Sequence, residues 1–127
     1  MVRKKSTLKS EEKAKLILEA MEDKKAVDPV VIEVRGRTVM TDFIIVASGT
    51  SKIHIKAIVD AVIDNLADQR VKGKRLEGYS EGAWVLIDYG DVVVHVLAPE
   101  QREFYRLEAY WSGAEKGSPP PLSPEEV

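Results

Sequence analysis

The stretch WVLIDYGDVVVHVL, residues 84–97, decides the fold because it reads as two β-strands joined by a tight turn. Gly90 and Asp91 fit a type II′ turn, in which glycine takes the positive φ of the first central position. Such a turn places Asp88 opposite Val93 and makes side chains alternate between the two faces of the hairpin. One face is predicted to be core and carries Val85, Ile87, Tyr89, Val92, Val94 and Val96. The other face carries Trp84, Leu86, Asp88, Val93, His95 and Leu97.

The second face of this hairpin mixes a large aromatic side chain with aliphatic, acidic and imidazole groups, a combination typical of protein–protein interfaces. We therefore expect Trp84 to be exposed on a docking surface. The alternative is that a helix covers this face and Trp84 belongs to the core. The longer stretch 76–101 contains five acidic side chains and no Lys or Arg, although the chain has 19 such cations. This bias predicts a basic partner.

The flanking sequence alternates helical and strand-like patterns. Besides the hairpin, we predict three strands, at Val30–Val34, at Asp42–Ser48, which reads as buried on both faces, and at Arg75–Tyr79. We also predict three helices: one capped by Ser10, one that follows a cap at Thr50 or Ser51, and a closing helix at Arg102–Trp111. This order predicts an α/β fold, a single-domain sandwich in which helices pack on a mixed β-sheet. The helix after Ser51 has a wide apolar surface, which suggests contact with a second subunit.

Composition limits the class of protein. With 127 residues the chain is long enough for one domain, which we place at 1–115, followed by a disordered proline-rich tail at 116–127. The sequence has no cysteine, so disulfides and thiolate metal sites are excluded. No apolar run approaches the roughly 20 residues needed to cross a bilayer, and the N-terminus lacks the apolar core of a secretory signal. We therefore expect a cytoplasmic protein with no membrane partner.

Asp88 and Asp91 are the only paired carboxylates near a turn, so they are candidates for a metal site or an acid–base pair. Metal-dependent nucleotide transferases place two acids at i and i+2 on one strand. These two acids lie at i and i+3 across a turn, with no clear third ligand. His54 and His95 lie near no candidate nucleophile, and we expect His95 to be a partly buried packing residue. We expect no catalytic residue, metal or cofactor, and interpret both acids as anchors for a cationic partner.

Two other segments could bind phosphate groups. Gly49-Thr50-Ser51 would present free amides at a helix start, but capping explains these residues equally well. The cations of Arg70–Arg75 could touch RNA phosphates, although a solvated helix end is the more frequent meaning of such a run. The alternative function from another class is a nucleotide-binding or nucleotidyltransferase-like enzyme that uses this GTS turn, with Asp88 and Asp91 on a divalent ion.

Three segments carry a resemblance to a known family: TDFIIVASGTSKIHIKAIVDAV (41–62), EG…WVLIDYGDVVVHV (81–96) and REFYRLEAYW (102–111). Together they resemble the ribosomal silencing factor family, also called iojap, over residues 8–111. The resemblance implies a non-enzymatic factor that binds the large ribosomal subunit through one of its proteins at the inter-subunit face. Such a factor blocks joining of the small subunit and lowers translation in stationary phase or starvation. The resemblance also implies a nucleotidyltransferase-like fold and a homodimer.

The family's binding surface falls on the first strand of the hairpin and its turn. Carried over residue by residue, the expected partner-binding residues are Trp84, Leu86, Asp88, Tyr89 and Asp91, followed by Asp42, His54, Asp60 and Arg102. Tyr89 lies on the core side of the predicted hairpin, which conflicts with a place in the surface. Ribosomal proteins are usually basic, so a face without cations would complement one of them, with a minor contact to ribosomal RNA.

Overall fold

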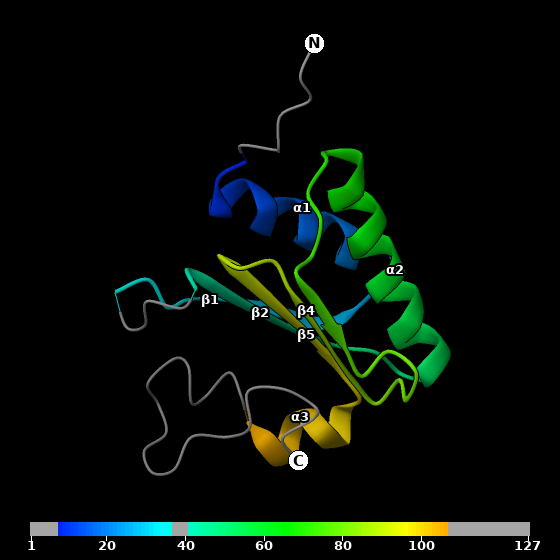
Figure 1. The fold of residues 1–127 in the computed structure, drawn as a ribbon. Coiled ribbons are helices and arrows are strands. Elements are labelled where there is room, and N and C mark those ends of the chain that lie inside the picture. Colours follow the sequence, from blue (N-terminus) through cyan, green and yellow to red (C-terminus); the bar gives the residue numbers. More distant parts are fainter. Residues whose placement is uncertain (1–7, 37–40, 107–127) are drawn as a thin grey trace.

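The computed structural model describes residues 8–36 and 41–106 and has the predicted α/β architecture (Figure 1). Its elements are α1 (Ser10–Asp23), β1 (Val27–Glu33), β2 (Phe43–Ser48), α2 (Lys52–Asp68), β3 (Arg75–Glu77), β4 (Trp84–Asp88), β5 (Val92–Leu97) and α3 (Pro99–Tyr105). The sheet has the strand order β1-β2-β5-β4-β3. Strand β2 runs parallel to β5 and all other neighbours are antiparallel, so the expected mixed sheet is confirmed. The likeness to nucleotidyltransferases stays a prediction.

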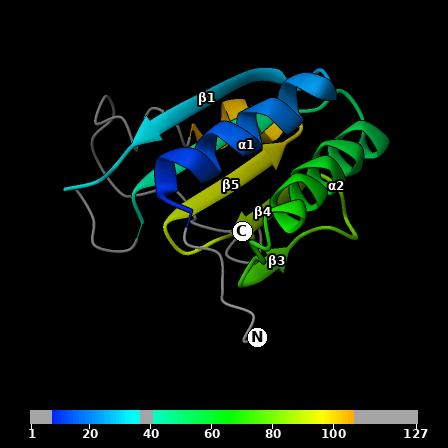
Figure 2. The same cartoon turned by 90° about the horizontal axis from the view of Figure 1, so that it is seen from above.

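Helices cover the two faces of the sheet unequally. Helices α1 and α2 lie on one face and α3 lies on the other (Figure 1), and the view from above shows α1 and α2 side by side (Figure 2). The larger core cluster lies between the sheet and the two long helices and includes Ile17, Met21, Ile45, Ile58 and Leu66. A smaller cluster on the other face contains Ile32, Val34, Ile44, Val46, Trp84 and Leu97. The fold therefore has one thick core and one thin core.

The start of α2 follows from local chemistry, as predicted. Ser51 is the N-cap, and its hydroxyl accepts a hydrogen bond from the His54 N–H at 3.0 Å. The apolar residues behind the cap return every three or four positions, which places one continuous stripe against the sheet. The side chains that widen this stripe, such as Ala61 and Ile63, pack against the same core. The width of the stripe thus serves this chain's own packing and does not require a second subunit.

Several predicted boundaries are wrong. Helix α1 begins at Ser10 with Lys9 as its N-cap, and the Ser10 hydroxyl accepts a hydrogen bond from Arg35 instead of capping the helix. Strand β1 begins at Val27, not Val30, because a register irregularity accommodates Pro29 inside this edge strand. Strand β3 is shorter than expected. Helix α3 begins at Pro99, where a missing N–H costs nothing, and Arg106 caps it in a left-handed conformation. Residues 107–111 of the predicted helix, and the tail at 116–127, lie outside the described residues.

The hairpin has the predicted register but not the predicted exposure. Asp88 lies opposite Val93, and Gly90 has a φ of +89° at the turn. Trp84 is only 3% exposed, so the expectation of an exposed anchor is wrong and the core alternative holds. Its indole Nε1–H donates to Nδ1 of His95 at 3.0 Å. That bond satisfies the one polar group of the indole, which lets the ring be buried without a large desolvation cost.

His95 is a buried packing residue, more completely buried than expected. Burial lowers the pKa of the imidazole to about 4, because a charged ring would lose its hydration. The neutral ring must carry its proton on Nε2, since Nδ1 accepts from Trp84. Trp84 and His95 therefore form a neutral polar pair inside the thin core.

Replacing Gly49 by alanine is expected to destabilise the protein by about 1–3 kcal/mol, because a Cβ there overpacks the junction of β2 and α2. The added carbon would lie 2.6 Å from Cγ1 of Ile55 and 3.0 Å from its backbone nitrogen, which cannot move freely. Urea unfolding measures the change. Thr50→Ala, at the next and exposed position, is the control and should cost under about 1 kcal/mol. Equal effects of the two changes would contradict the close approach.

Truncating Trp84 to alanine should lower the free energy of unfolding by about 3–5 kcal/mol, because it removes a buried indole and leaves His95 without its donor. Trp84→Phe should cost less, since it retains most of the apolar volume. Val31→Ala on the edge strand, where the side chain is 38% exposed, is the control. A folded, fully stable alanine variant would show that the indole is a surface group.

The pH dependence of stability should report His95. As pH falls below about 6.5, the unfolded chain gains a proton on this ring while the folded chain does not until about pH 4. The neutral ring therefore contributes fully to the free energy of unfolding above pH 6.5, and this contribution falls as the pH drops from 6.5 to 4. The free energy of unfolding should decrease by about 2 kcal/mol between pH 7.5 and pH 5. His95→Gln retains an acceptor for Trp84 and should remove this loss in urea titrations at both pH values. His54→Gln is the control and should lose as much stability as the wild type between the two pH values. If the His95 variant also loses that much, His95 is not the group responsible.

Candidate functional site

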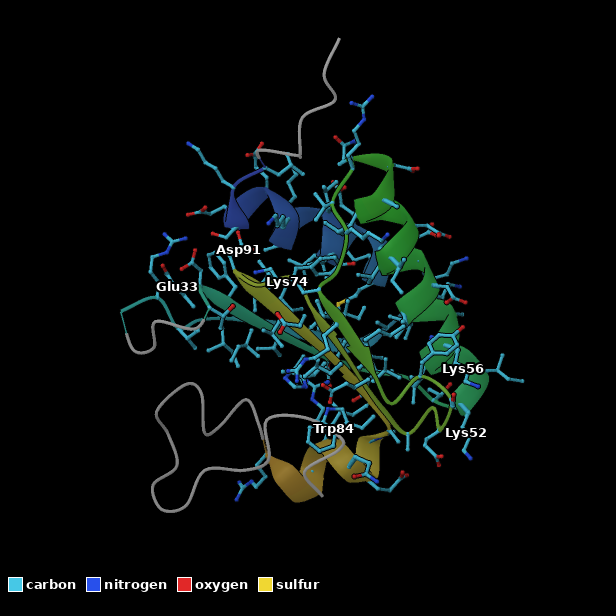
Figure 3. All side chains as sticks on the ribbon, in the orientation of Figure 1. Glu33, Lys52, Lys56, Lys74, Trp84 and Asp91 are labelled. Atoms are coloured by element: carbon cyan, nitrogen blue, oxygen red, sulfur yellow. The ribbon has the colours of Figure 1, made fainter. Side chains whose placement is uncertain are left out.

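Three aspartates lie at the turn end of the β4–β5 hairpin, each beside a different cation, and we call Asp42, Asp88 and Asp91 the acidic end. The Asp42 N–H donates to the backbone oxygen of Asp91 at 2.9 Å, which ties the start of β2 to the hairpin turn. Oδ1 of Asp88 accepts the Gly90 N–H at 2.7 Å, so the turn itself orients this carboxylate. The Asp88 and Asp91 side chains are 25% and 33% exposed. Figure 3 shows Asp91 at the edge of the sheet below α1.

The acidic end is not free of cations, contrary to expectation. Lys13 from α1 pairs with Asp91 at 2.9 Å, and Arg75 from β3 lies 3.8 Å from Asp88. Arg35, which follows β1, lies 3.5 Å from Asp42. All three cations come from outside the stretch 76–101. A segment without Lys or Arg thus forms part of a surface of mixed charge, because the fold brings distant residues beside it.

Arg35 connects several acids next to this site. Its guanidinium lies 3.0 Å from Glu11 and 3.8 Å from Glu33, in addition to its contact with Asp42, and it stacks over the ring of Phe43 at 5.3 Å. A backbone hydrogen bond, assisted by Arg35, lowers the pKa of Glu11, and the bond to Glu11 raises the pKa of Arg35. These groups are exposed, so the network orients side chains more than it stabilises the fold. Nothing in the sequence pattern singled out Lys13 or Arg35 as part of the site.

The apolar members of the predicted surface lie beneath it. Leu86 is buried on the same face as Trp84, and Tyr89 is buried in the large core, as its position in the hairpin predicted. Burial raises the pKa of Tyr89 to about 12, so its hydroxyl stays protonated at neutral pH. Of the five partner-binding residues predicted first (Trp84, Leu86, Asp88, Tyr89 and Asp91), only the two aspartates present side chains to solvent. The other three support the strand and turn that carry them.

His54 and Arg102 each join two elements. His54 accepts the Thr50 N–H on Nδ1 at 2.9 Å and its Nε2 lies 2.8 Å from the backbone oxygen of Lys24, which ties α2 to the end of α1. Arg102 donates to the backbone oxygens of Val27 and Asp28 at 3.1 and 2.6 Å, which ties α3 to β1. Both residues lie near the far end of β2 and β5 from the acidic end.

Asp60 lies on the exposed side of α2 and also stays apart from the acidic end. Its carboxylate accepts the Tyr79 hydroxyl at 2.9 and 3.1 Å, and this bond raises the pKa of Tyr79. The structure therefore does not bring the nine predicted residues into one site. It places Asp42, Asp88 and Asp91 at one end of the sheet, where the buried Trp84, Leu86 and Tyr89 support the hairpin.

The GTS turn is a helix cap. The Gly49 N–H donates to Leu97, the Thr50 N–H donates to His54, and the Ser51 hydroxyl accepts from the helix. Over residues 8–36 and 41–106, no three His, Asp or Glu side chains gather closely enough to hold a metal ion. None of the described helices is both long and apolar enough to cross a membrane.

Known proteins resemble this chain over most of its length. A family model described as "Ribosomal silencing factor during starvation" matches residues 7–126. The Ribosomal silencing factor RsfS of Halalkalibacterium halodurans is 37% identical over 107 residues, which cover 84% of this chain and 92% of that protein. The mouse protein named "Mitochondrial assembly of ribosomal large subunit protein 1" is 29% identical over 76% of this chain and 44% of its own length.

A crystal structure of a Chromobacterium violaceum protein has the same fold. It superposes with a TM-score of 0.81 at 36% identity and covers 93% of this chain and 98% of its own. The Ribosomal silencing factor RsfS of that organism is 40% identical to this chain over 103 residues, 81% of this chain and 84% of that protein. Sequence and fold agree on the same relatives. The chain belongs to the ribosomal silencing factor family.

Proposed function

We propose that this protein binds the large ribosomal subunit at its inter-subunit face and keeps the small subunit from joining, which represses translation in starvation or stationary phase. Membership of the silencing factor family supports this proposal, and so does the mouse relative whose name refers to the large ribosomal subunit. The action is steric and needs no catalytic residue. Its site of action is the cytoplasm, where subunits join.

The acidic end is the part of the surface that we assign to the partner, a basic ribosomal protein. The observation that carries this assignment is that Asp88 and Asp91 are partly exposed and already oriented by the turn, by Lys13 and by Arg75. The exposed pair of Arg75 with Asp88 is of a kind that contributes less than about 1 kcal/mol to stability, so a basic partner can replace it at small cost. The partly buried pair of Lys13 with Asp91 stays in place, and the partner joins it. Fixed carboxylates then set the register of docking and raise the association rate.

The remaining predicted residues act on this surface indirectly in the proposal. Trp84, Leu86 and Tyr89 fill both sides of β4 and keep its turn in place. His54 ties α2 to the end of α1, and Arg102 ties α3 to β1. The minor contact with ribosomal RNA that we propose is with backbone phosphates alone, and the exposed cations of the segment 70–75 would make it without base stacking in the adjoining cleft.

We also propose a homodimer for the free protein. The stripe of α2 is buried within the chain, but Ile53 at its start is 83% exposed and offers an apolar contact. Sedimentation velocity of the wild type and of Ile53→Ser tests this: a dimer that Ile53→Ser dissociates is expected. A monomer at every concentration would contradict it.

Neutralising the two hairpin acids should weaken binding to purified large subunits by at least about tenfold. The variant Asp88→Asn/Asp91→Asn retains side-chain shape, and an asparagine at 88 can still accept the Gly90 N–H. The matched control, Asp64→Asn/Asp68→Asn, removes two exposed charges from α2 and should bind like the wild type. Co-sedimentation with large subunits on density gradients gives the affinities, and thermal unfolding shows that both variants are folded.

The same gradients test the mechanism. Wild-type protein should migrate with the large subunit and reduce the fraction of joined ribosomes when small subunits are added. Failure to migrate with the large subunit would refute the binding proposal. Normal joining in the presence of bound protein would refute steric exclusion while leaving binding intact.

A further inference from the structure

A cleft of about 530 Å³ opens between the end of α2 and strands β3 and β4. Its floor is apolar and is formed mainly by Ile63, Ala67, Val71, Ile87 and Tyr89. The loop from Arg70 to Arg75 forms its rim and places four cations around the opening. An apolar floor beneath a positive rim suits a ligand that is both apolar and acidic.

Within residues 8–36 and 41–106, three of these cations have no acidic partner. Arg70, Lys72 and Lys74 are exposed, and within the described ranges no carboxylate lies in ion-pair distance of their side chains. Arg75 differs, because it pairs with Glu77 at 2.7 Å and lies beside Asp88. Their side chains lie on the loop side of the cleft, and that of Lys74 also reaches the hairpin turn, because a Cβ on Gly90 would lie 3.1 Å from its Nζ. This side therefore attracts anions, although the chain as a whole has a net charge of −2.

The free edge of the sheet borders the same cleft. Strand β3 is the last strand in the sheet order, so its outer edge has no neighbour in the part of the chain that the structure describes. Leu76 on this strand is 46% exposed and lines the cleft. Unpaired backbone amides and carbonyls can bind an extended peptide as an added strand, with its side chains in adjacent pockets.

The chemistry of the floor distinguishes a peptide from a nucleic acid. Single-stranded nucleic acids bind by stacking their bases on exposed aromatic rings. Among the described residues that line this cleft, Tyr89 alone is aromatic and it is buried, and the other floor groups are aliphatic. Aliphatic floors accept apolar side chains, and the rim complements carboxylates.

We infer that this cleft is a docking site for an extended, acidic segment of another protein, which inserts a large apolar side chain between α2 and β4 and places its carboxylates on Arg70, Lys72 and Lys74. The partner has the opposite charge from the one proposed for the acidic end. The two surfaces adjoin at Lys74 and Arg75, which lie beside Gly90 and Asp88. This inference does not depend on the ribosomal role.

The test uses the full chain, labelled with nitrogen-15, and a synthetic peptide EDEFEDE with blocked ends. At about 1 mM peptide, a range that detects weak complexes, amide shifts are expected at Val71, Gly73 and Leu76. A peptide with serine in place of phenylalanine should bind at least about tenfold more weakly, because it lacks the apolar anchor. No shifts at these amides, or equal binding of the serine peptide, would overturn the proposal.

Variants separate charge from shape. The double variant Lys72→Glu/Lys74→Glu should weaken peptide binding by at least about tenfold. The variant Ala67→Phe fills the cleft without changing its charge and should abolish peptide binding. The matched control is Lys52→Glu/Lys56→Glu, two lysines on the first turns of α2 away from Lys74 (Figure 3), which should bind like the wild type. Circular dichroism confirms that each variant is folded. If a ten-nucleotide oligouridylate binds more tightly than the peptide and is lost on the Lys72/Lys74 reversal, the site binds nucleic acid and the proposal is wrong.

Discussion

The central strand β5 is the element on which the rest of this structure depends. It pairs with β4 through the hairpin and with β2 in parallel, so it joins the two halves of the sheet. Its side chains are buried on both faces except at Val93, and each fully buried valine contributes about 1.5 kcal/mol or more. Because β5 must satisfy two neighbours and two cores at once, its register fixes where the turn at Gly90 and the strand β4 lie. The positions of Asp88 and Asp91 follow from that register.

The two cores place different demands on the side chains that fill them. The face under α1 and α2 is purely apolar around β5, through Val92, Val94 and Val96. The other face includes His95, which is tolerable only as a neutral ring with a donor at Nδ1. Trp84 supplies that donor and a large apolar surface with one side chain. The same pair of residues therefore explains both a buried imidazole and a buried indole.

Local patterns predicted the parts of the fold that depend on neighbours in sequence. Alternation predicted the hairpin register, and capping chemistry predicted a start of α2 at Thr50 or Ser51, of which Ser51 is the cap. Alternation says which side chains share a face, but not what covers that face, so the burial of Trp84 was missed. Lys13 and Arg35 were missed for a related reason. They reach the acidic end only through the packing of α1 and the pairing of β1 with β2, which no short-range pattern records.

Arg75 has a special place in the charge distribution of this surface. It contacts Asp88 at the edge of the acidic end, and its shorter ion pair is with Glu77, which is only 6% exposed. One oxygen of Glu77 lacks a hydrogen-bond partner among the described residues, so this buried carboxylate depends on Arg75 for its stabilisation. Arg75 is thereby held by Glu77 on its own strand and by Asp88 on the next, although it also lines the cleft. Lys74 also lies beside the acidic end, because a Cβ on Gly90 would be 3.1 Å from its Nζ, so the acidic and the basic surface meet at the hairpin turn and each changes the electrostatic potential of the other.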